Sequence, residues 1–291
     1  MLEVLLQTGV NAVYAASFMA LVAVGLVLIF GVMGVINFAH GELYMLGAYT
    51  VVYVYAGHAL PFPLAVAAGL IFVGLVGVAM EQALFRPMRA NPLGGLIVSI
   101  GMLLILQALV VAGFGVRMVN VPPPHQVAIP LFGQAGVTIP LQRLITIAAA
   151  LVLLGGLWLF LKRSRFGRAL RACAQDPEAA ALQGISLNQT ARMAMFIGAA
   201  LAGTAGALTA PLVRTYPYMG HPIIVTAFIV IIVGGMGSLE GAVVAAILYA
   251  LVSTFVTTFW DGVTADIVGL LLMLLVLVVR PYGLFGKPER A

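Results

Sequence analysis

The chain has 291 residues, of which 63% are hydrophobic and only 8% are charged, and its net charge is +5. Soluble domains carry about a quarter charged residues, so this composition excludes a soluble globular fold. The cations lie in a few short loops rather than in a basic patch interleaved with aromatic residues, which argues against nucleic-acid binding.

Long unbroken apolar runs, instead of the alternation typical of strands, predict helices that cross a bilayer. The sequence therefore predicts a single all-α, polytopic membrane domain over residues 1–291, with eight or nine transmembrane spans. No Lys or Arg precedes Arg86, so we expect the first run to remain as a span and not to be a cleaved signal peptide. The predicted spans are 10–32, 42–57, 64–85, 94–114, 141–161, 190–213, 222–236, 240–259 and 264–280.

The first glycine-rich interruption, GVMGVINFAHG, covers Gly31 to Gly41 and is followed by Glu42. Polar groups in an apolar stretch are costly in hydrocarbon and usually face a cavity, a partner or the interface. We therefore predict that Asn37 and His40 line a solute pathway. An ordinary loop at the cytoplasmic interface, where Glu42 reaches water, is the alternative.

A proline-rich loop at about 115–140 carries Pro122-Pro123-Pro124, Pro130 and Pro140. Because proline fixes φ and removes a donor, we expect this outer loop to be extended rather than helical. It is either a surface connection or a docking rim for a partner outside the membrane.

The loop at about 162–190 predicts a short helix of about two turns on the cytoplasmic side. Asp176 is suited to cap it, Pro177 to start it, and Glu178 to lie at the positive end of its dipole. Gly184 suits a left-handed turn at its end. Such a helix is too short to be stable alone, so we expect it to need a partner surface.

The second glycine-rich interruption, GGMGSLEG, covers Gly234 to Gly241 and contains Ser238 and Glu240. Glycine-interrupted segments in the two halves of a transporter point to its pathway. We accordingly add Ser238 to the predicted pathway and treat Glu42 and Glu240 as polar residues at the breaks. The alternative of an ordinary interfacial loop applies to this break as well, with Glu240 reaching water.

The distribution of Lys and Arg predicts the orientation, because positive loops are retained in the cytoplasm. Loops at 86–89, 162–192 and 280–290 hold eleven of the fourteen Lys and Arg residues, and only Arg117, Arg143 and Arg214 fall on the other side. The C-terminus is therefore expected in the cytoplasm. With nine spans the N-terminus lies outside.

The sequence lacks the common motifs for ATP binding, metal binding and nucleophilic catalysis. It contains no G-x-x-x-x-G-K-[ST] loop for ATP phosphates, no Cys/His cluster, no H-E-x-x-H pair and no G-x-S-x-G elbow. The single cysteine, Cys173, permits no disulfide within the chain. We expect no catalytic residue, no metal and no cofactor in this chain.

Several segments resemble the branched-chain amino acid permease subunits of ABC importers. The most specific are INFAHGELYMLGAY and AFIVIIVGGMGSLEGA, and the likeness extends through TAPLVRTYPYMGHP to the terminal RPYGLFG. The cytoplasmic run E-A-A-x-x-x-G resembles the coupling motif that such permeases present to their ATPase subunits. Ala245 and Ala246 depart from the glycine often found after the second motif in relatives.

This resemblance implies a multi-pass permease of a bacterial-type inner membrane, without ATPase activity of its own. Its partners would be a second homologous permease, two cytoplasmic ATPase subunits that bind ATP, an external solute-binding protein and the surrounding membrane lipid. The resemblance also implies alternating access. ATPase coupling would fall on the short helix and the residues that flank it: Asp176, Pro177, Glu178, Ala179, Ala180 and Gly184.

Two other functions stay open at this point. Related permeases handle urea and short amides, so the substrate is not restricted to branched-chain amino acids. A proton-coupled secondary transporter that uses Glu42, Glu81 and Glu240 is the other alternative. A scaffold role explains neither glycine-rich interruption.

Overall fold

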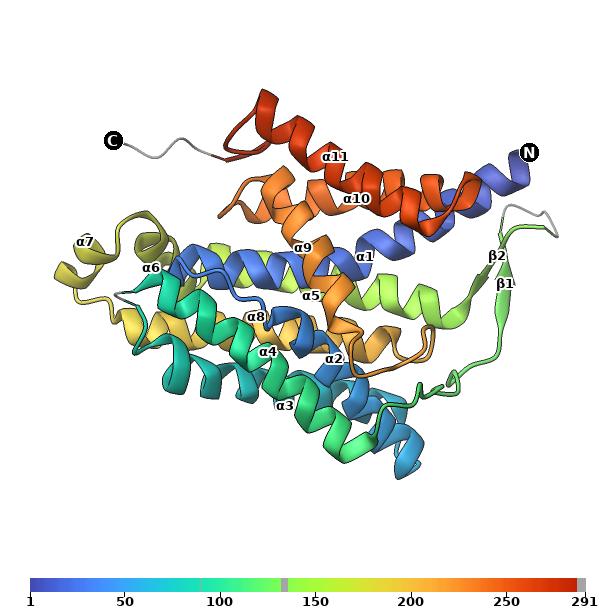
Figure 1. Ribbon diagram of the computed structural model, residues 1–291, viewed down its shortest axis with the longest axis horizontal. Helices are drawn as coiled ribbons and strands as arrows, with labels where there is room; N and C mark the ends of the chain where they lie inside the picture. The colour runs from blue at the N-terminus through green and yellow to red at the C-terminus, as the bar shows by residue number, and fades with distance from the viewer. Residues whose placement is uncertain (90, 132–135, 287–291) are drawn as a thin grey trace.

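The computed structural model describes residues 1–291 except 90, 132–135 and 287–291. It is a helical bundle with one small hairpin (Figure 1). The elements are α1 (Leu2–Met33), α2 (His40–Val51), the π-helix η1 (Val52–Gly57), α3 (Phe62–Met80), the π-helix η2 (Glu81–Phe85), α4 (Pro92–Phe114), β1 (Ala128–Pro130), β2 (Thr138–Pro140), α5 (Leu141–Arg163), α6 (Arg165–Gln175), α7 (Pro177–Leu182), α8 (Leu187–Thr209), α9 (Gly220–Gly234), α10 (Leu239–Phe259) and α11 (Gly262–Val279).

Within the described residues, seven helices are long and apolar enough to cross a membrane, and α9 is a shorter apolar helix. This confirms a polytopic, all-helical membrane fold. The nine predicted spans correspond to α1, α2 with η1, α3 with η2, α4, α5, α8, α9, α10 and α11. Because α2 and α9 are too short to cross by themselves, the count of eight or nine spans stays a prediction.

Burial separates inner helices from outer ones. In α1 and α8 the most apolar stretch is 72% and 78% buried, whereas in α5 and α11 it is 17% and 11% buried. Since lipid is as apolar as a protein core, the exposed apolar faces of α5 and α11 are suited to hydrocarbon. Helices α1 and α8 thus form the centre of the bundle.

Helix α8 packs against α1, α2 and α3 with its backbone in direct contact with theirs. A Cβ added to Gly203 would lie 2.6 Å from the Cβ of Val73 on α3, and one added to Gly47 on α2 would overlap the backbone of Gly203. On α1, a Cβ at Gly25 would lie 2.6 Å from the Gly198 carbonyl oxygen. Small residues permit this close approach, which is how helices associate in membranes without a hydrophobic driving force.

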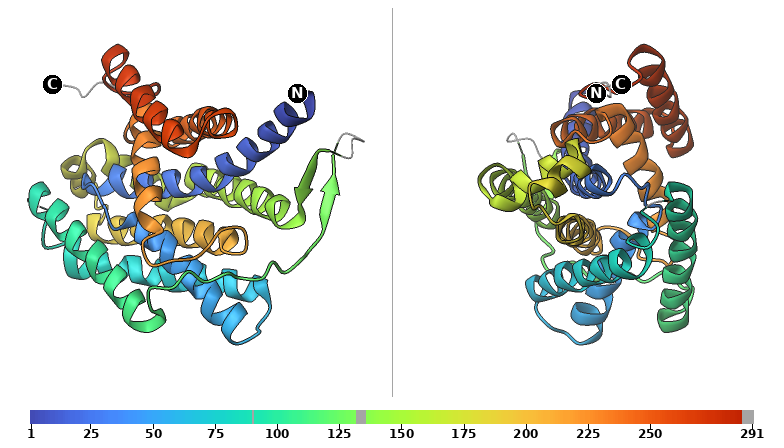
Figure 2. Two further views of the ribbon diagram at one scale, coloured as in Figure 1. Left: turned by 45° about the vertical axis from the view of Figure 1, so that its right-hand side comes forward. Right: turned by 90° about the vertical axis from the view of Figure 1, so that its left-hand side faces the viewer.

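Helix α9 crosses the bundle at an angle. It contacts α2 at one side and α10 and α11 at the other (Figure 2). This placement puts the start of α9 beside the start of α2.

The proline-rich loop contains no helix among its described residues, as its sequence predicts, and it ends in an antiparallel hairpin in which Ile129 pairs with Ile139. The Gln7 side chain ties this hairpin to α1. Its amide nitrogen donates to the Thr138 carbonyl at 3.1 Å, and its oxygen accepts from the Thr138 N–H at 3.0 Å. Residues 132–135 lie outside the described residues.

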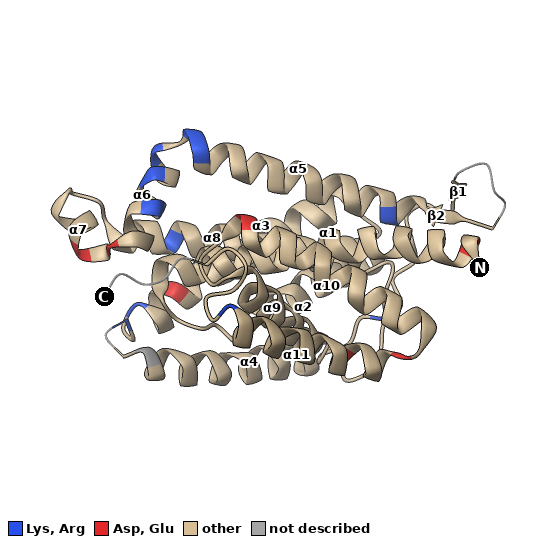
Figure 3. Cartoon of the chain, turned by 90° about the horizontal axis from the view of Figure 1, so that it is seen from above, with Lys and Arg blue, Asp and Glu red and all other residues tan. Residues whose placement is uncertain are grey.

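Charged residues gather at the two ends of the bundle. Most Lys and Arg surround α6 and α7, and α1 begins at the opposite end (Figures 1 and 3). Lys287 and Arg290 lie outside the described residues. This separation is the pattern that the positive-inside rule requires of opposite membrane faces.

Candidate functional site

The first glycine-rich interruption folds back into the bundle. Helix α1 ends at Met33, and the next residue, Gly34, has a φ of 63°, the left-handed conformation that glycine adopts at helix ends. The chain then returns to the interior, so α2 begins at a fully buried histidine, His40. Asn37 is 1% exposed, and its side-chain oxygen accepts from the Ala39 N–H at 3.0 Å.

The N-terminus of α2 meets the N-terminus of α9 inside the protein. A Cβ on Gly220 would lie 2.6 Å from the Gly41 carbonyl oxygen, and a Cβ on Gly41 would overlap Gly220 in turn. Only glycine permits the two backbones to touch here. The partial positive charges of both helix N-termini therefore converge on one point.

Glu42 lies at this point and is fully buried. One carboxylate oxygen accepts from the Gln107 side chain of α4 at 3.0 Å, and the other has no hydrogen-bond partner among the described residues. A Cβ on Gly220 would lie 2.7 Å from the carboxylate carbon, so the carboxylate abuts the start of α9. Glu42 is thus shielded from water in this arrangement, in contrast to the interfacial interpretation, and its role at the break stays a prediction.

His40 connects the break to α1. Its Nε2 lies 3.0 Å from the Val22 carbonyl oxygen. Because a carbonyl only accepts, Nε2 carries the proton in this contact. Nδ1 of His40 and the side-chain nitrogen of Asn37 are buried and have no partner among the described residues. Three polar side chains at the break thus each have one buried polar atom with no hydrogen-bond partner, and such atoms are costly.

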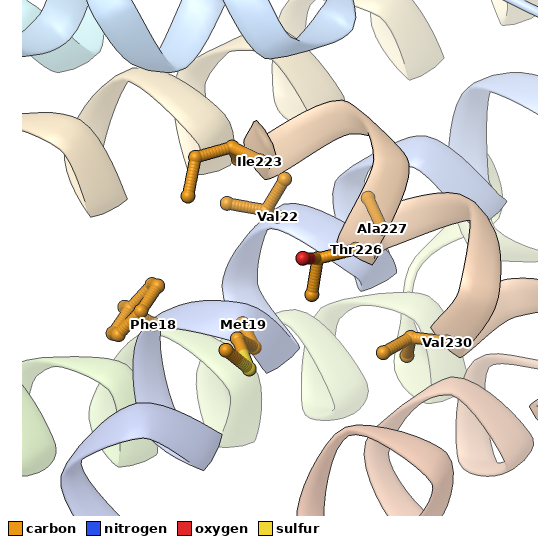
Figure 4. A pocket seen from close by; sticks show the side chains of 7 residues that line it. All are labelled: Phe18, Met19, Val22, Ile223, Thr226, Ala227 and Val230. Carbon is orange, nitrogen blue, oxygen red and sulfur yellow. The ribbon is translucent and has the colours of Figure 1, made fainter. Parts of the chain in front are cut away.

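A small apolar hollow lies beside the break, between α1 and α9 (Figure 4). Val22 links the two features, since its carbonyl contacts His40 and its side chain lines the hollow. Thr226 supplies the one hydroxyl of the lining. The lining residues are Phe18, Met19, Val22, Ile223, Thr226, Ala227 and Val230.

The second glycine-rich interruption forms the turn between α9 and α10 and lies apart from the first. Ser238 caps α10, with its hydroxyl accepting from the Gly241 N–H at 3.0 Å, and Glu240 is exposed. The C-terminal segment packs on this turn, because the Leu284 and Phe285 N–H groups donate to the last carbonyls of α9. Ser238 therefore does not join Asn37 and His40 in one cluster, and the interfacial interpretation fits Glu240.

The short helix between α6 and α8 forms as predicted. The Asp176 carboxylate accepts from the N–H groups of Glu178 and Ala179 at 3.0 and 2.9 Å, Pro177 is the first residue of α7, and Gly184 has a φ of 78°. Ala180 alone among the α7 residues is buried.

Helix α7 otherwise faces outward. Leu182, its last residue, is 87% exposed. Apart from Ala180, every residue of this six-residue helix is exposed.

Two features of this region were not predicted from the sequence. Gln107 is the partner of Glu42, and its one signal was a polar residue inside the apolar run 94–114. Arg89 pairs with the buried Glu81 and donates to Asn188 in the first turn of α8. Nothing in the sequence spacing indicated that contact.

Comparison with known proteins identifies the family. Residues 9–277 match the family described as the permease component of the branched-chain amino acid transport system. The chain belongs to this permease family. The family is described as a transport component rather than as an enzyme. As a member of it, the chain is a multi-pass membrane protein.

Relatives align with this permease over nearly its whole length. It is 34% identical to the high-affinity branched-chain amino acid transport system permease protein BraD of Pseudomonas aeruginosa, over 98% of this chain and 96% of the relative. It is 35% identical to the corresponding permease protein LivH of Escherichia coli, with the same coverage. The solved structure of PsaBC from Streptococcus pneumoniae in complex with Fab shares the fold, with a TM-score of 0.53, 14% identity, and coverage of 94% of this chain and 92% of that one.

Proposed function

We propose that this permease forms part of the pore of an ATP-driven importer that carries branched-chain amino acids into the cell. The main observation behind this proposal is the capped helix α7, which is exposed at the basic end of a permease whose sequence contains no ATP-binding loop. Relatives named as branched-chain amino acid permeases support the substrate class.

The assembly that we infer places α7 in the cytoplasm against one of two ATPase subunits. A second, homologous permease completes the pore, and an external solute-binding protein docks at the end that carries the loop at about 115–140 and the β1–β2 hairpin. The charge distribution supports this orientation in an inner membrane, with the C-terminus in the cytoplasm.

Helix α8 is the element suited to transmit movement from the ATPase. It begins five residues after α7 ends and extends through the centre of the bundle, where its backbone touches that of α2 at Gly203 and Gly47. Displacement of α7 would therefore shift α8 and, with it, α2. Rigid close-packed contacts transmit such shifts as steps between discrete arrangements.

Alternating access is then proposed at the break where α2 and α9 begin. In this arrangement the break is closed, and Asn37, His40 and Glu42 have no water access. Opening would expose their unpaired atoms, together with the convergent helix N-termini, to a zwitterionic solute. The adjacent hollow would offer an apolar wall to an aliphatic side chain.

The proton-coupled alternative receives less support. Glu81 is paired with Arg89 and Glu240 is exposed, so only Glu42 remains as a buried carboxylate without an ionic partner among the described residues. One isolated carboxylate does not make a proton relay across the bilayer.

Reconstitution tests the proposal. The complete importer, in proteoliposomes with ATP on the ATPase side, is expected to accumulate leucine, isoleucine and valine, and competition with urea and acetamide checks the amide alternative. Uptake driven by a proton gradient without ATP, or uptake of urea in preference to leucine, would contradict it.

A further inference from the structure

The end of α5 and the following helix α6 form a continuous basic surface. Ser164 is the single residue between the two helices, and its hydroxyl caps α6 by accepting from the Gly167 N–H at 2.9 Å. From this corner α6 turns across the end of the bundle (Figure 3). Leu170 and Cys173 bury its apolar side against the bundle.

The cations lie in the last turn of α5 and on α6. Within the described residues no carboxylate forms an ion pair with any of them, because the single ion pair there joins Arg89 and Glu81. The nearest acid in sequence, Asp176, caps α7 instead. We call this surface the basic face, and its exposed members are Lys162, Arg163, Arg165, Arg168 and Arg171.

The basic face adjoins the surface that faces hydrocarbon. Trp158 and Phe160, on the last two turns of α5, are 54% and 39% exposed, and the Lys162 ammonium lies 4.6 Å from the Trp158 ring centroid. Exposed tryptophan followed by cations marks the headgroup level of a span. The cations therefore lie at the depth of lipid phosphates.

We propose that the basic face binds the headgroups of anionic phospholipids. Guanidinium groups match phosphate oxygens in paired hydrogen bonds, and a basic amphipathic helix in the interface plane attracts anionic lipid. An acidic protein surface is a poorer match, because exposed aromatic side chains of the kind that mark the headgroup level lie beside the cations.

The position of α6 gives this binding a consequence, which rests on the proposed function. Only Asp176 separates α6 from α7, and Ala180 of α7 packs with Leu170 and Cys173 of α6. Lipid bound to the basic face would hold α6 in place, and α7 packs on α6. Anionic lipid would thus support coupling to the ATPase.

Lipid retention by the purified full-length permease tests the proposal. Phosphatidylglycerol and phosphatidylcholine are offered in detergent, and bound lipid is counted by native mass spectrometry. We expect the wild-type protein to retain phosphatidylglycerol in preference. The Arg165→Gln/Arg168→Gln variant should lose affinity about fivefold per charge, since one basic residue near an anionic surface contributes ~1 kcal/mol.

The matched control is Arg86→Gln/Arg280→Gln, which removes two exposed cations that follow η2 and α11 and lie outside the basic face. It should retain phosphatidylglycerol as the wild type does, and Arg165→Lys/Arg168→Lys should retain most of it. Equal loss in control and test variants would overturn the proposal, as would equal retention of the two lipids by the wild type.

A further measurement distinguishes bound lipid from a bound protein partner at the basic face. If Arg165→Gln/Arg168→Gln releases the ATPase subunits in pure phosphatidylcholine vesicles, the basic face is a protein contact and the lipid proposal is wrong. Because retention is measured on the permease alone, it stands or falls independently of whether leucine is the imported solute.

Discussion

Arg89, in the connection between α3 and α4, donates a hydrogen bond of 2.6 Å to the side chain of Asn188 at the start of α8. The same guanidinium pairs with the fully buried carboxylate of Glu81. These contacts join α8, the helix that follows α7, to the first residue of η2. The start of α8 is thereby held against the bundle where a force from α7 would enter it.

This cluster predicts a strong stability effect. Arg89→Ala leaves the Glu81 carboxylate buried without its partner, and breaking such a pair costs about 3–5 kcal/mol. Thermal unfolding in detergent is expected to show a clear loss, most of which Glu81→Gln/Arg89→Gln restores by removing both charges. No destabilisation of Arg89→Ala would refute the buried pair.

The contact with Asn188 predicts a separate effect on coupling. Asn188→Ala removes a neutral partner and is expected to leave the protein folded, because Glu81 keeps its ion pair. ATP hydrolysis by the full importer should then depend less on substrate, and uptake per ATP should fall. Unchanged uptake per ATP would mean that the contact has no part in transmission.

Close backbone contact predicts that Gly47 tolerates no side chain. Gly47→Ala places a methyl group on the backbone of Gly203, and overpacking of this kind costs about 1–3 kcal/mol. Gly155→Ala, on the exposed side of α5 with open space around it, is the matched control. Thermal unfolding should separate the two variants, and equal stability would show that α2 and α8 are not in contact.

The capping of α7 by Asp176 is expected to be needed for coupling to the ATPase. Asp176→Ala removes the acceptor for two N–H groups and should destabilise the helix by about 1 kcal/mol, whereas Asp176→Asn keeps a capping side chain. Glu178→Lys with Gly184→Val disturbs both the dipole end and the left-handed turn. We expect uptake to fall in Asp176→Ala and in the double variant but not in Asp176→Asn. Membrane insertion should be retained in all three. Wild-type uptake in the double variant would contradict the coupling role.

The predicted pathway is tested by thiol labelling in a Cys173→Ala background, since Cys173 is the one cysteine of the chain. Single cysteines at positions 37 and 40 should react with a small water-soluble reagent only in the nucleotide state that opens the break. A cysteine in place of Ser238, in the exposed α9–α10 turn, serves as the state-independent comparison. Constant labelling at positions 37 and 40 from the cytoplasmic face alone would remove these residues from the pathway.

Local sequence determined most of the elements. Each long apolar run became a helix, because a run of about 20 apolar residues satisfies its own backbone in hydrocarbon. The cap at Asp176 and the turn at Gly184 act within a few residues of α7, so their geometry was predictable from spacing. Both glycine-rich interruptions were correctly placed as breaks in helices.

Only the tertiary structure decided which break is buried. Glu42 and Glu240 occupy similar glycine-rich contexts, yet the first is buried against α4 and α9 and the second is exposed. Hydropathy could not separate them, because lipid, a protein interior and a buried helix start are all apolar surroundings for the flanking residues. The difference arises from Gly41 and Gly220, which lie far apart in the chain and let the starts of α2 and α9 touch.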